Sequence, residues 1–181
     1  MYKNEEMKIL VIIPAYNEEK NIKETVERLK ESAASVDYVV INDCSKDRTE
    51  RILKNLGITY ISLPVNLGIG GAVQTGYKYG VENGYDIAIQ MDGDGQHDPK
   101  YLDTLIAPIV SGTADVVIGS RFLKKEGFQS SRSRRIGIRI LGMLVSICCI
   151  QQIKDVTSGF RAVNKEFMQV FAKDYPQDYP E

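Results

Sequence analysis

Met7-Lys8-Ile9-Leu10-Val11-Ile12-Ile13 is an almost continuous apolar run, and Pro14 ends it. A short run without polar alternation, rich in β-branched residues, predicts a strand that is buried on both faces. Strands of this kind occur in parallel sheets whose two faces are covered by helices. The run therefore predicts that the segments after it alternate between helix and strand.

Helical and extended segments do alternate along the chain. The spacing of apolar residues predicts helices at 19–35, 47–56, 68–83 and 99–110. Apolar runs predict further strands at 38–41, 58–61, 85–91 and 115–118. Asn17 is the expected N-cap of the first helix. Five strands alternating with four helices predict an α/β domain with a Rossmann-like, mostly parallel sheet and helices on both faces.

The composition excludes several classes of protein. The chain has 181 residues, of which 43% are hydrophobic and 26% charged, as in one globular domain. Its net charge of −1 argues against a nucleic-acid binder. The three cysteines lack zinc-ligand spacing and indicate reduced thiols in the cytoplasm. We expect neither a signal peptide nor a membrane-spanning segment, because residues 1–8 are polar and no run reaches about 18 apolar residues.

The expected strand at 85–91 is followed by Asp92-Gly93-Asp94-Gly95-Gln96-His97-Asp98. Ligands of doubly wound sheets bind at the carboxyl ends of the strands. Asp92 and Asp94 therefore predict a metal and phosphate site, since Mg²⁺ or Mn²⁺ prefers oxygen ligands and is commonly shared between carboxylates and substrate phosphates. An EF-hand is excluded, because no glutamate stands at the twelfth position. Asp98 is interpreted as the N-cap of the helix that follows.

The loops after the first two strands contribute further polar side chains. Tyr16, after the first strand, could stack on or flank a nucleobase. Asp43, after the second strand, could accept hydrogen bonds from a base or ribose, or serve as a turn residue. Ser45 and Asp47 are interpreted as helix caps.

Three later segments complete the set of candidate loops. The segment 66–72 does not match the dinucleotide fingerprint, because Val73 stands where a glycine or alanine is needed, and it predicts a tight turn that opens a helix. Arg121 follows the last expected strand and could bind a phosphate with two parallel hydrogen bonds. The segment 155–161 combines an acid, hydroxyls and an arginine, and predicts a loop over the same carboxyl-end face.

A basic block precedes an apolar segment late in the chain. Residues 120–139 hold seven Lys or Arg residues against one acid, and residues 140–150 are almost wholly apolar. Eleven residues are too few to span a bilayer. A basic head with an apolar body fits a helix lying on an anionic membrane surface. The alternative is a buried helix, or the interface of a homo-oligomer, with a solvated basic end.

Taken together and in this order, the motifs resemble glycosyltransferase family 2, whose members have the GT-A fold. The matching segments are Pro14 to Glu19, Asp43 to Asp47, Asn66 to Gly68, Asp92 to Asp94, Gly119 to Arg121 and Ser158 to Arg161. Within the family, the D-x-D-x-Q pattern of Asp92 to Gln96 and the basic block make the chain most similar to polyprenyl-phosphate sugar transferases, such as dolichyl-phosphate mannose synthase and its bacterial undecaprenyl-phosphate relatives.

The resemblance implies a metal-dependent, inverting transfer of a hexose from a UDP- or GDP-linked sugar to a polyprenyl phosphate, by a cytoplasmic protein at the inner face of the cell membrane. The residues that would frame the base and ribose are Pro14, Tyr16, Glu18, Ile41 and Asp43. The donor's ribose and diphosphate would be held by Asp92, Gly93 and Asp94, and Mg²⁺ or Mn²⁺ by Asp92, Asp94 and Gln96.

The resemblance also implies catalytic roles. Arg121 would contact the donor diphosphate or the acceptor phosphate, and Asp94 would act through the metal. A phosphate acceptor is already a competent nucleophile, whereas a hydroxyl acceptor needs a carboxylate base, for which Asp155 is the candidate. Asn42 departs from the family's Asp-Asp pair at this place.

Two other functions remain open at this stage. One is transfer to a sugar hydroxyl in surface polysaccharide or cell-wall synthesis, and the other is a non-catalytic subunit that binds nucleotide sugars. Because family members continue beyond the segment at which this chain ends, we expect residues 1–181 to form a single catalytic domain that is truncated at its C-terminus.

Overall fold

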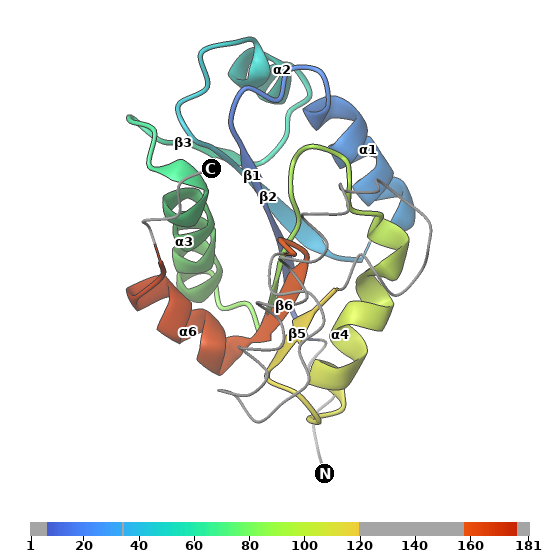
Figure 1. Cartoon of the computed structure of the whole chain (residues 1–181). Helices are drawn as coiled ribbons and strands as arrows, with labels where there is room; N and C mark the ends of the chain where they lie inside the picture. The colour runs from blue at the N-terminus through green and yellow to red at the C-terminus, as the bar shows by residue number, and fades with distance from the viewer. Residues whose placement is uncertain (1–6, 34, 120–157, 177–181) are drawn as a thin grey trace, which may run out of the picture.

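The computed structural model describes residues 7–33, 35–119 and 158–176, which form one sheet with helices on both faces (Figure 1). The strands are β1 (Ile9–Ala15), β2 (Asp37–Asn42), β3 (Tyr60–Ser62), β4 (Ile87–Gln90), β5 (Val116–Ile118) and β6 (Arg161–Asn164). The helices are α1 (Ile22–Ser32), α2 (Thr49–Asn55), α3 (Gly68–Glu82), α4 (Leu102–Val110) and α6 (Lys165–Lys173). All the expected elements are present, with ends shifted by up to three residues.

The sheet has the strand order β3, β2, β1, β4, β6, β5. β1 pairs in parallel with β2 and β4, and β2 pairs in parallel with β3. β6 runs antiparallel between β4 and β5. The mostly parallel α/β sheet is thus confirmed, and β6 is the exception to its direction.

The sequence did not predict β6 or α6, and one expectation there is wrong. Arg161, expected in a loop over the carboxyl-end face, is the first residue of β6 and pairs with Gln90. The pairing still brings the start of β6 to the carboxyl end of β4, where Ser158 to Phe160 lie. The rest of the expected loop, residues 155–157, lies outside the described residues.

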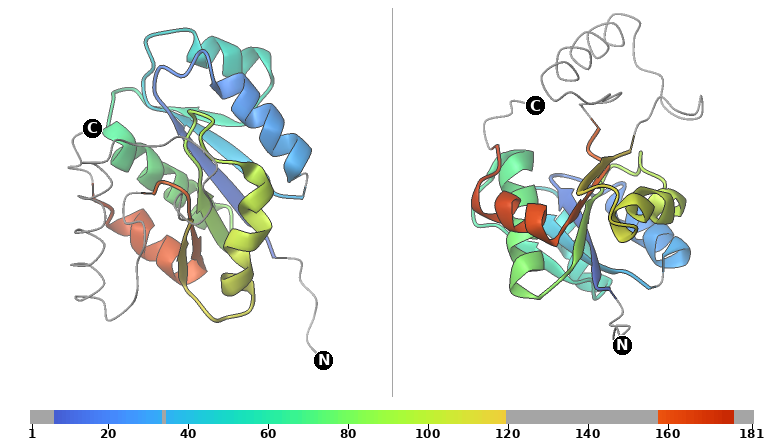
Figure 2. Two further views of the ribbon diagram at one scale, coloured as in Figure 1. Left: turned by 45° about the vertical axis from the view of Figure 1, so that its right-hand side comes forward. Right: turned by 90° about the horizontal axis from the view of Figure 1, so that it is seen from below.

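Helices cover the sheet on both faces (Figure 2). α1, α2 and α4 pack on one face, where apolar side chains at helical spacing, such as Ile22, Val26 and Leu29 of α1, join the core. α3 and α6 pack on the other face and against each other. This arrangement confirms that the sheet is covered by helices on both faces.

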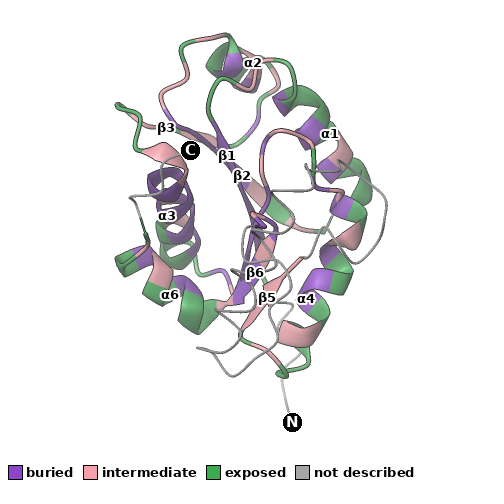
Figure 3. Cartoon of the chain, viewed as in Figure 1, coloured by how far each residue is buried: buried purple, intermediate pink, exposed green. Residues whose placement is uncertain are grey.

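β1 lies inside the sheet, and six of its seven residues are buried (Figure 3). Leu10, Val11, Ile12 and Ile13 are each 0% exposed, and their side chains alternate between the two cores. Both faces of β1 are covered, as the continuous apolar run in the sequence predicted.

Two helix starts test the capping interpretations. Asn17 is not the N-cap of α1, which begins at Ile22; its backbone is left-handed, with φ of 57°, and its side chain bonds to another loop. Asp98 is confirmed as a cap, because its Oδ1 accepts a hydrogen bond from the Lys100 N–H at 3.2 Å. It caps a single 3₁₀ turn, Pro99–Tyr101, that leads into α4.

The basic block and apolar segment of residues 120–150 lie outside the described residues. Across the helices that the structure does describe, none combines the length and the apolar character needed to cross a bilayer.

The close approach of α3 to β1 gives a test of the fold. A Cβ added at Gly76 would overlap Ile12 Cγ2, in the middle of the sheet. Overpacking a core costs about 1–3 kcal/mol, whereas alanine is favoured over glycine in a helix by roughly 1 kcal/mol. Gly76→Ala should therefore lower the free energy of unfolding by up to about 2 kcal/mol, measured by urea unfolding. The exposed Lys78→Ala on the same helix should change it little, and a stabilised Gly76→Ala would contradict the close packing.

Candidate functional site

The polar loops meet at one edge of the sheet because three neighbouring strands end there. Ala15 and Asn42, the last residues of β1 and β2, are directly paired. Ile12 pairs with Gln90 at the end of β4, and the Met91 N–H donates to the Ile12 carbonyl at 3.0 Å. The chain segments that contain Tyr16, Asp43 and Asp92 therefore leave the sheet side by side (Figure 1).

Asp92 is held by a histidine. Its Oδ2 lies 2.9 Å from Nε2 of His97, which is 7% exposed. The ring of His97 stacks on Phe160, with centroids 5.1 Å apart and planes 14° apart. Burial by itself would raise the pKa of Asp92, but the interactions with His97, together with the side chain of Gln90 and the positive charge of Arg161, outweigh it and lower the pKa below its usual value. Asp92 is therefore a carboxylate at neutral pH.

The turn around Asp94 is anchored to α1. Thr25 Oγ1 donates to the Gly93 carbonyl at 3.1 Å, and an Arg28 nitrogen donates to the Gly95 carbonyl at 3.3 Å. Asp94 Oδ1 accepts a hydrogen bond from the Gln96 N–H at 2.9 Å. The turn is thereby fixed by side chains from an element about 67 residues away in sequence.

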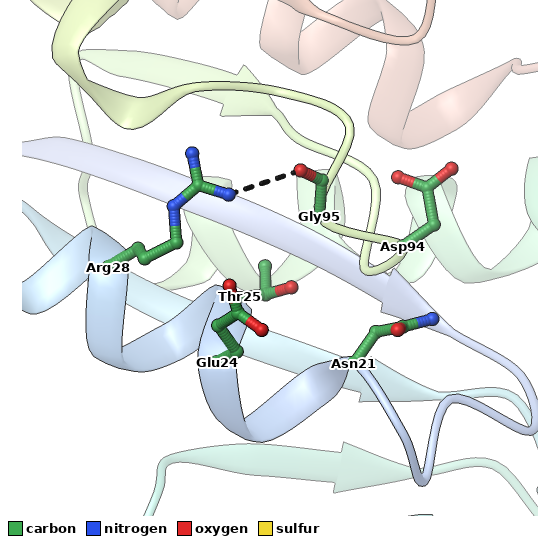
Figure 4. A pocket seen from close by; sticks show the side chains of 6 residues that line it. All are labelled: Asn21, Glu24, Thr25, Arg28, Asp94 and Gly95. Carbon is green, nitrogen blue, oxygen red and sulfur yellow. Dashed lines mark hydrogen bonds between the residues drawn. The ribbon is translucent and has the colours of Figure 1, made fainter. Parts of the chain in front are cut away.

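A hollow of about 100 Å³ separates the turn from the helix (Figure 4). Its lining residues are Asn21, Glu24, Thr25, Arg28, Asp94 and Gly95. The lining is polar and carries charges of both signs.

Gly93 is required by the close approach of two backbones. A Cβ at this position would lie 2.9 Å from the Pro14 carbonyl oxygen and would also meet Glu18 and Ala15. The missing side chain of Gly93 thus lets the loop after β4 pass close to the loop after β1.

The shifted pKa of Glu18 indicates that several negative charges lie close together at this edge. Burial is the largest cause that raises its pKa above the usual value. The hydrogen bond that Asn21 donates to Glu18 Oε2, at 2.8 Å, opposes this shift. The negative charges of Asp94, Asp47 and Asp92 raise the pKa further. A cation placed here would relieve the repulsion between these carboxylates.

The loops after β1 and β2 are tied to each other by reciprocal hydrogen bonds. The Asn17 N–H donates to Ser45 Oγ at 3.0 Å, and Asn17 Oδ1 accepts from the Lys46 N–H at 2.9 Å. The Glu19 N–H donates to Asp47 Oδ2 at 3.0 Å. The interpretation of Ser45 as a helix cap is therefore wrong, because its hydroxyl binds the neighbouring loop.

Asp47 both caps α2 and joins the two loops. Its Oδ1 accepts hydrogen bonds from the backbone N–H of Thr49 at 2.9 Å and from the Thr49 hydroxyl at 2.6 Å. These bonds lower the pKa of Asp47, although burial alone would raise it. The capping interpretation is confirmed for this residue.

Asp43 and Asn42 organise the loop that follows β2. Asp43 is 3% exposed, and its Oδ1 accepts from the Leu67 N–H at 2.7 Å, which fixes the tight turn that opens α3. Asn42 donates to Ser62 Oγ at 2.9 Å and accepts from the Ser45 N–H at 3.2 Å. The residue that departs from the family pattern thus has a structural role.

The expected site residues divide into three groups. Those that the structure brings to one edge of the sheet are Pro14, Tyr16, Glu18, Asp43, Asp92, Gly93, Asp94 and Gln96. Ile41 is fully buried in the core on the α3 face, so its side chain supports the edge from beneath. Arg121 and Asp155 lie outside the described residues.

Sequence reasoning missed the side chains that hold the site in place. Thr25 and Arg28 lie on α1, and nothing local marks them as partners of the loop after β4; Gly159 and Phe160 lie in a segment that was expected over this face, but their contacts with Asp92 and His97 were not predicted. His97 offered a signal, because it is the only histidine of the chain and lies five residues after Asp92. Within the described ranges, no three His, Cys, Asp or Glu side chains are placed to hold a metal ion by themselves.

Two curated proteins are similar in sequence to almost the whole chain. A UDP-N-acetylglucosamine–dolichyl-phosphate N-acetylglucosaminyltransferase of Methanococcus voltae is 32% identical over 183 residues, which cover 91% of this chain and 72% of the relative. An undecaprenyl-phosphate mannosyltransferase of Micrococcus luteus is 32% identical over 174 residues, which cover 93% of this chain and 71% of the relative.

The fold is also that of a solved enzyme. Glucosyl-3-phosphoglycerate synthase of Mycobacterium tuberculosis, crystallised with Mn²⁺, UDP and glucosyl-3-phosphoglycerate, superimposes with a TM-score of 0.67 at 22% identity, covering 89% of this chain and 58% of that enzyme. This likeness shows a GT-A fold. The family model described as glycosyl transferase family 2 matches residues 10–171. The resemblance seen in the motifs is therefore confirmed, and the chain belongs to glycosyl transferase family 2.

Proposed function

We propose that this glycosyltransferase moves a hexose from a UDP- or GDP-linked donor to a polyprenyl phosphate. The observation that carries the proposal is the Asp92-Gly93-Asp94 turn at the end of β4, held against the loops that contain Glu18 and Asp43. Ligands of such sheets bind at this edge. The names of the relatives from Methanococcus voltae and Micrococcus luteus, which act on dolichyl or undecaprenyl phosphate, support the acceptor class.

The proposed reaction is a single displacement at the anomeric carbon. An oxygen of the acceptor phosphate forms a bond to that carbon, while the bond to the donor's β-phosphate oxygen breaks and the nucleoside diphosphate leaves, with inversion of configuration. The acceptor oxygen is already anionic, so no general base is required. A hydroxyl acceptor would need one, and for that alternative Asp155 stays the candidate.

The residues at the edge fit a divalent cation. Mg²⁺ is commonly held by one or two carboxylates together with substrate phosphates, so the absence of a complete protein cage among the described residues agrees with this mode of binding. Asp94 has one oxygen bonded to a backbone N–H, and its charge is felt by Glu18. Asp92 and Gln96 are the other proposed ligands. A bound cation would neutralise charge that develops on the leaving diphosphate.

The acceptor also bears on where the protein would act. A polyprenyl phosphate is embedded in a membrane, so we propose that the protein works in the cytoplasm at the inner surface of the cell membrane. The basic block and apolar segment of residues 120–150 are the proposed contact, with Arg121 at the phosphate. The same apolar segment would suit a homo-oligomer, which a sizing measurement without lipid would detect.

Removal of one carboxylate tests the donor site. In the wild-type chain, UDP or GDP with Mn²⁺ at 100 times its Kd should add about 2.7 kcal/mol of stability, and each 1 kcal/mol raises Tm by about 2–4 °C at this size. Asp94→Asn, which can still accept the Gln96 bond, should abolish this shift and leave the ligand-free Tm nearly unchanged. The control Asp103→Asn, on the exposed face of α4, should keep it. A full metal-dependent shift in Asp94→Asn would refute the assignment.

Repulsion at Glu18 predicts a pH-dependent stability. Because its pKa is raised in the folded chain, the folded state is disfavoured as pH rises through the usual value of 4.5 and then through the folded pKa. Glu18→Gln should therefore raise Tm of the ligand-free chain at pH 7, with little effect at pH 4 or below, where both states are protonated. Glu27→Gln, which removes an exposed charge from α1, should give no such gain. A loss of stability at pH 7 in Glu18→Gln would contradict the described charge cluster.

Product analysis distinguishes the candidate functions. With a labelled UDP- or GDP-hexose and Mn²⁺, label should pass to polyprenyl phosphate in detergent and be recovered in the lipid extract. Polyprenol without its phosphate should accept none. Transfer only to sugar hydroxyls would favour the polysaccharide alternative, and nucleotide binding without transfer to either acceptor would favour the non-catalytic subunit.

A further inference from the structure

We infer that His97 is a positioning residue, which fixes the carboxylate of Asp92 at the edge of the sheet where the donor nucleotide is proposed to bind. This inference rests on the proposed function and adds a residue to it. It assigns a role to the sole histidine of the chain and to Gly159 and Phe160, which lie more than 60 residues away from it in sequence.

The two oxygens of Asp92 have different surroundings. Oδ2 lies 2.9 Å from His97 Nε2. Oδ1 is buried and has no hydrogen-bond partner among the residues that the structure describes. A buried carboxylate oxygen without a hydrogen bond destabilises the folded chain. The His97 hydrogen bond therefore holds the carboxylate in a position that its other oxygen does not by itself favour.

His97 is itself held in one orientation. Its ring is 7% exposed and lies almost parallel to the ring of Phe160. Phe160 is 7% exposed and stands directly before β6, where its N–H donates to Ser158 Oγ at 3.3 Å. The antiparallel strand therefore determines where the imidazole lies, and the imidazole determines where Asp92 lies.

Gly159 closes the other side of the carboxylate. A Cβ added there would overlap Oδ2 of Asp92 and would lie 2.6 Å from Oδ1 and 2.8 Å from Cγ. Only glycine leaves room for the carboxylate in its present rotamer. Histidine on one side and glycine on the other restrict Asp92 to one position.

The hydrogen bond also fixes the protonation of the ring. A carboxylate oxygen accepts hydrogen bonds, and Oδ2 of Asp92 lies 2.9 Å from Nε2 of His97. Nε2 of His97 must therefore carry a hydrogen and donate it.

Stability alone does not account for this arrangement. A buried polar pair is often no more stabilising than apolar residues of the same volume, and a pair that leaves one oxygen unsatisfied is less so. Local violations of this kind are expected at functional sites. Asp92 is thus held ready for a ligand, at a cost to the free chain.

Nucleotide affinity tests the inference in the full chain. We would measure Kd for UDP and GDP with Mn²⁺ by calorimetry, together with Tm of the ligand-free protein. His97→Leu should raise Kd about tenfold or more for whichever of the two nucleotides binds more tightly. Residues that orient a ligand-binding side chain typically contribute about 10–100-fold to affinity. His97→Gln, whose Nε2 can still donate, should recover most of the affinity. Gly159→Ala should weaken nucleotide binding in the same way. This variant replaces His97→Leu in the test if His97→Leu does not fold.

A control separates positioning from general stability. Ile106→Ala removes a buried side chain of α4 that does not belong to this arrangement, so it should lower Tm without changing Kd. Wild-type affinity in both His97→Leu and Gly159→Ala would overturn the inference and leave the proposed function standing. A wild-type chain that binds neither nucleotide would overturn both.

A second measurement needs no ligand. Because the chain has one histidine, ¹⁵N-labelled protein without a histidine tag gives ring signals from His97 alone. We expect a spectrum with hydrogen on Nε2. A neutral ring with its hydrogen on Nδ1 alone would overturn the inference.

Discussion

The site depends on the burial of β1 on both faces. A strand so placed needs neighbouring strands on both sides and covering elements above and below it, because its backbone groups must be hydrogen-bonded and its apolar side chains removed from water. β2 and β4 occupy the two sides of β1, in registers that bring the carboxyl ends of all three strands to the same edge of the sheet, with β4 ending level with Ile12 of β1. The side chains that follow those ends are therefore neighbours, although they are about 30 to 75 residues apart in sequence.

Much of the fold could be predicted because its elements are long or strongly apolar. β1, α1 and α3 have patterns that local propensity and burial both favour. β6 was missed because it has four residues, of which two are apolar, and its antiparallel direction follows from pairing with β4 and β5. No feature of the sequence near β6 predicts that pairing.

The candidate site shows the same division between local and distant causes. Asp92, Asp94, Asp98 and Asp47 were interpreted from their own neighbourhoods, and for the two caps the structure agrees. Ser45 and Asn17 were wrongly assigned as caps because each has a partner about 28 residues away. A polar side chain near a helix start can satisfy the helix or another loop, and only the folded chain decides between them.

The edge of the sheet concentrates features that oppose folding. Glu18 is held among other carboxylates, one oxygen of Asp92 lacks a partner among the described residues, and Asn17 has a left-handed backbone. The cores on the two faces of the sheet, which are apolar and tightly packed, offset these costs. A cation at this edge would attract the carboxylates, and the hydroxyl groups of a nucleotide's ribose would provide hydrogen-bond donors. Stability and ligand binding would then be linked at this edge, because a ligand that relieves the repulsion between carboxylates binds the folded chain and stabilises it.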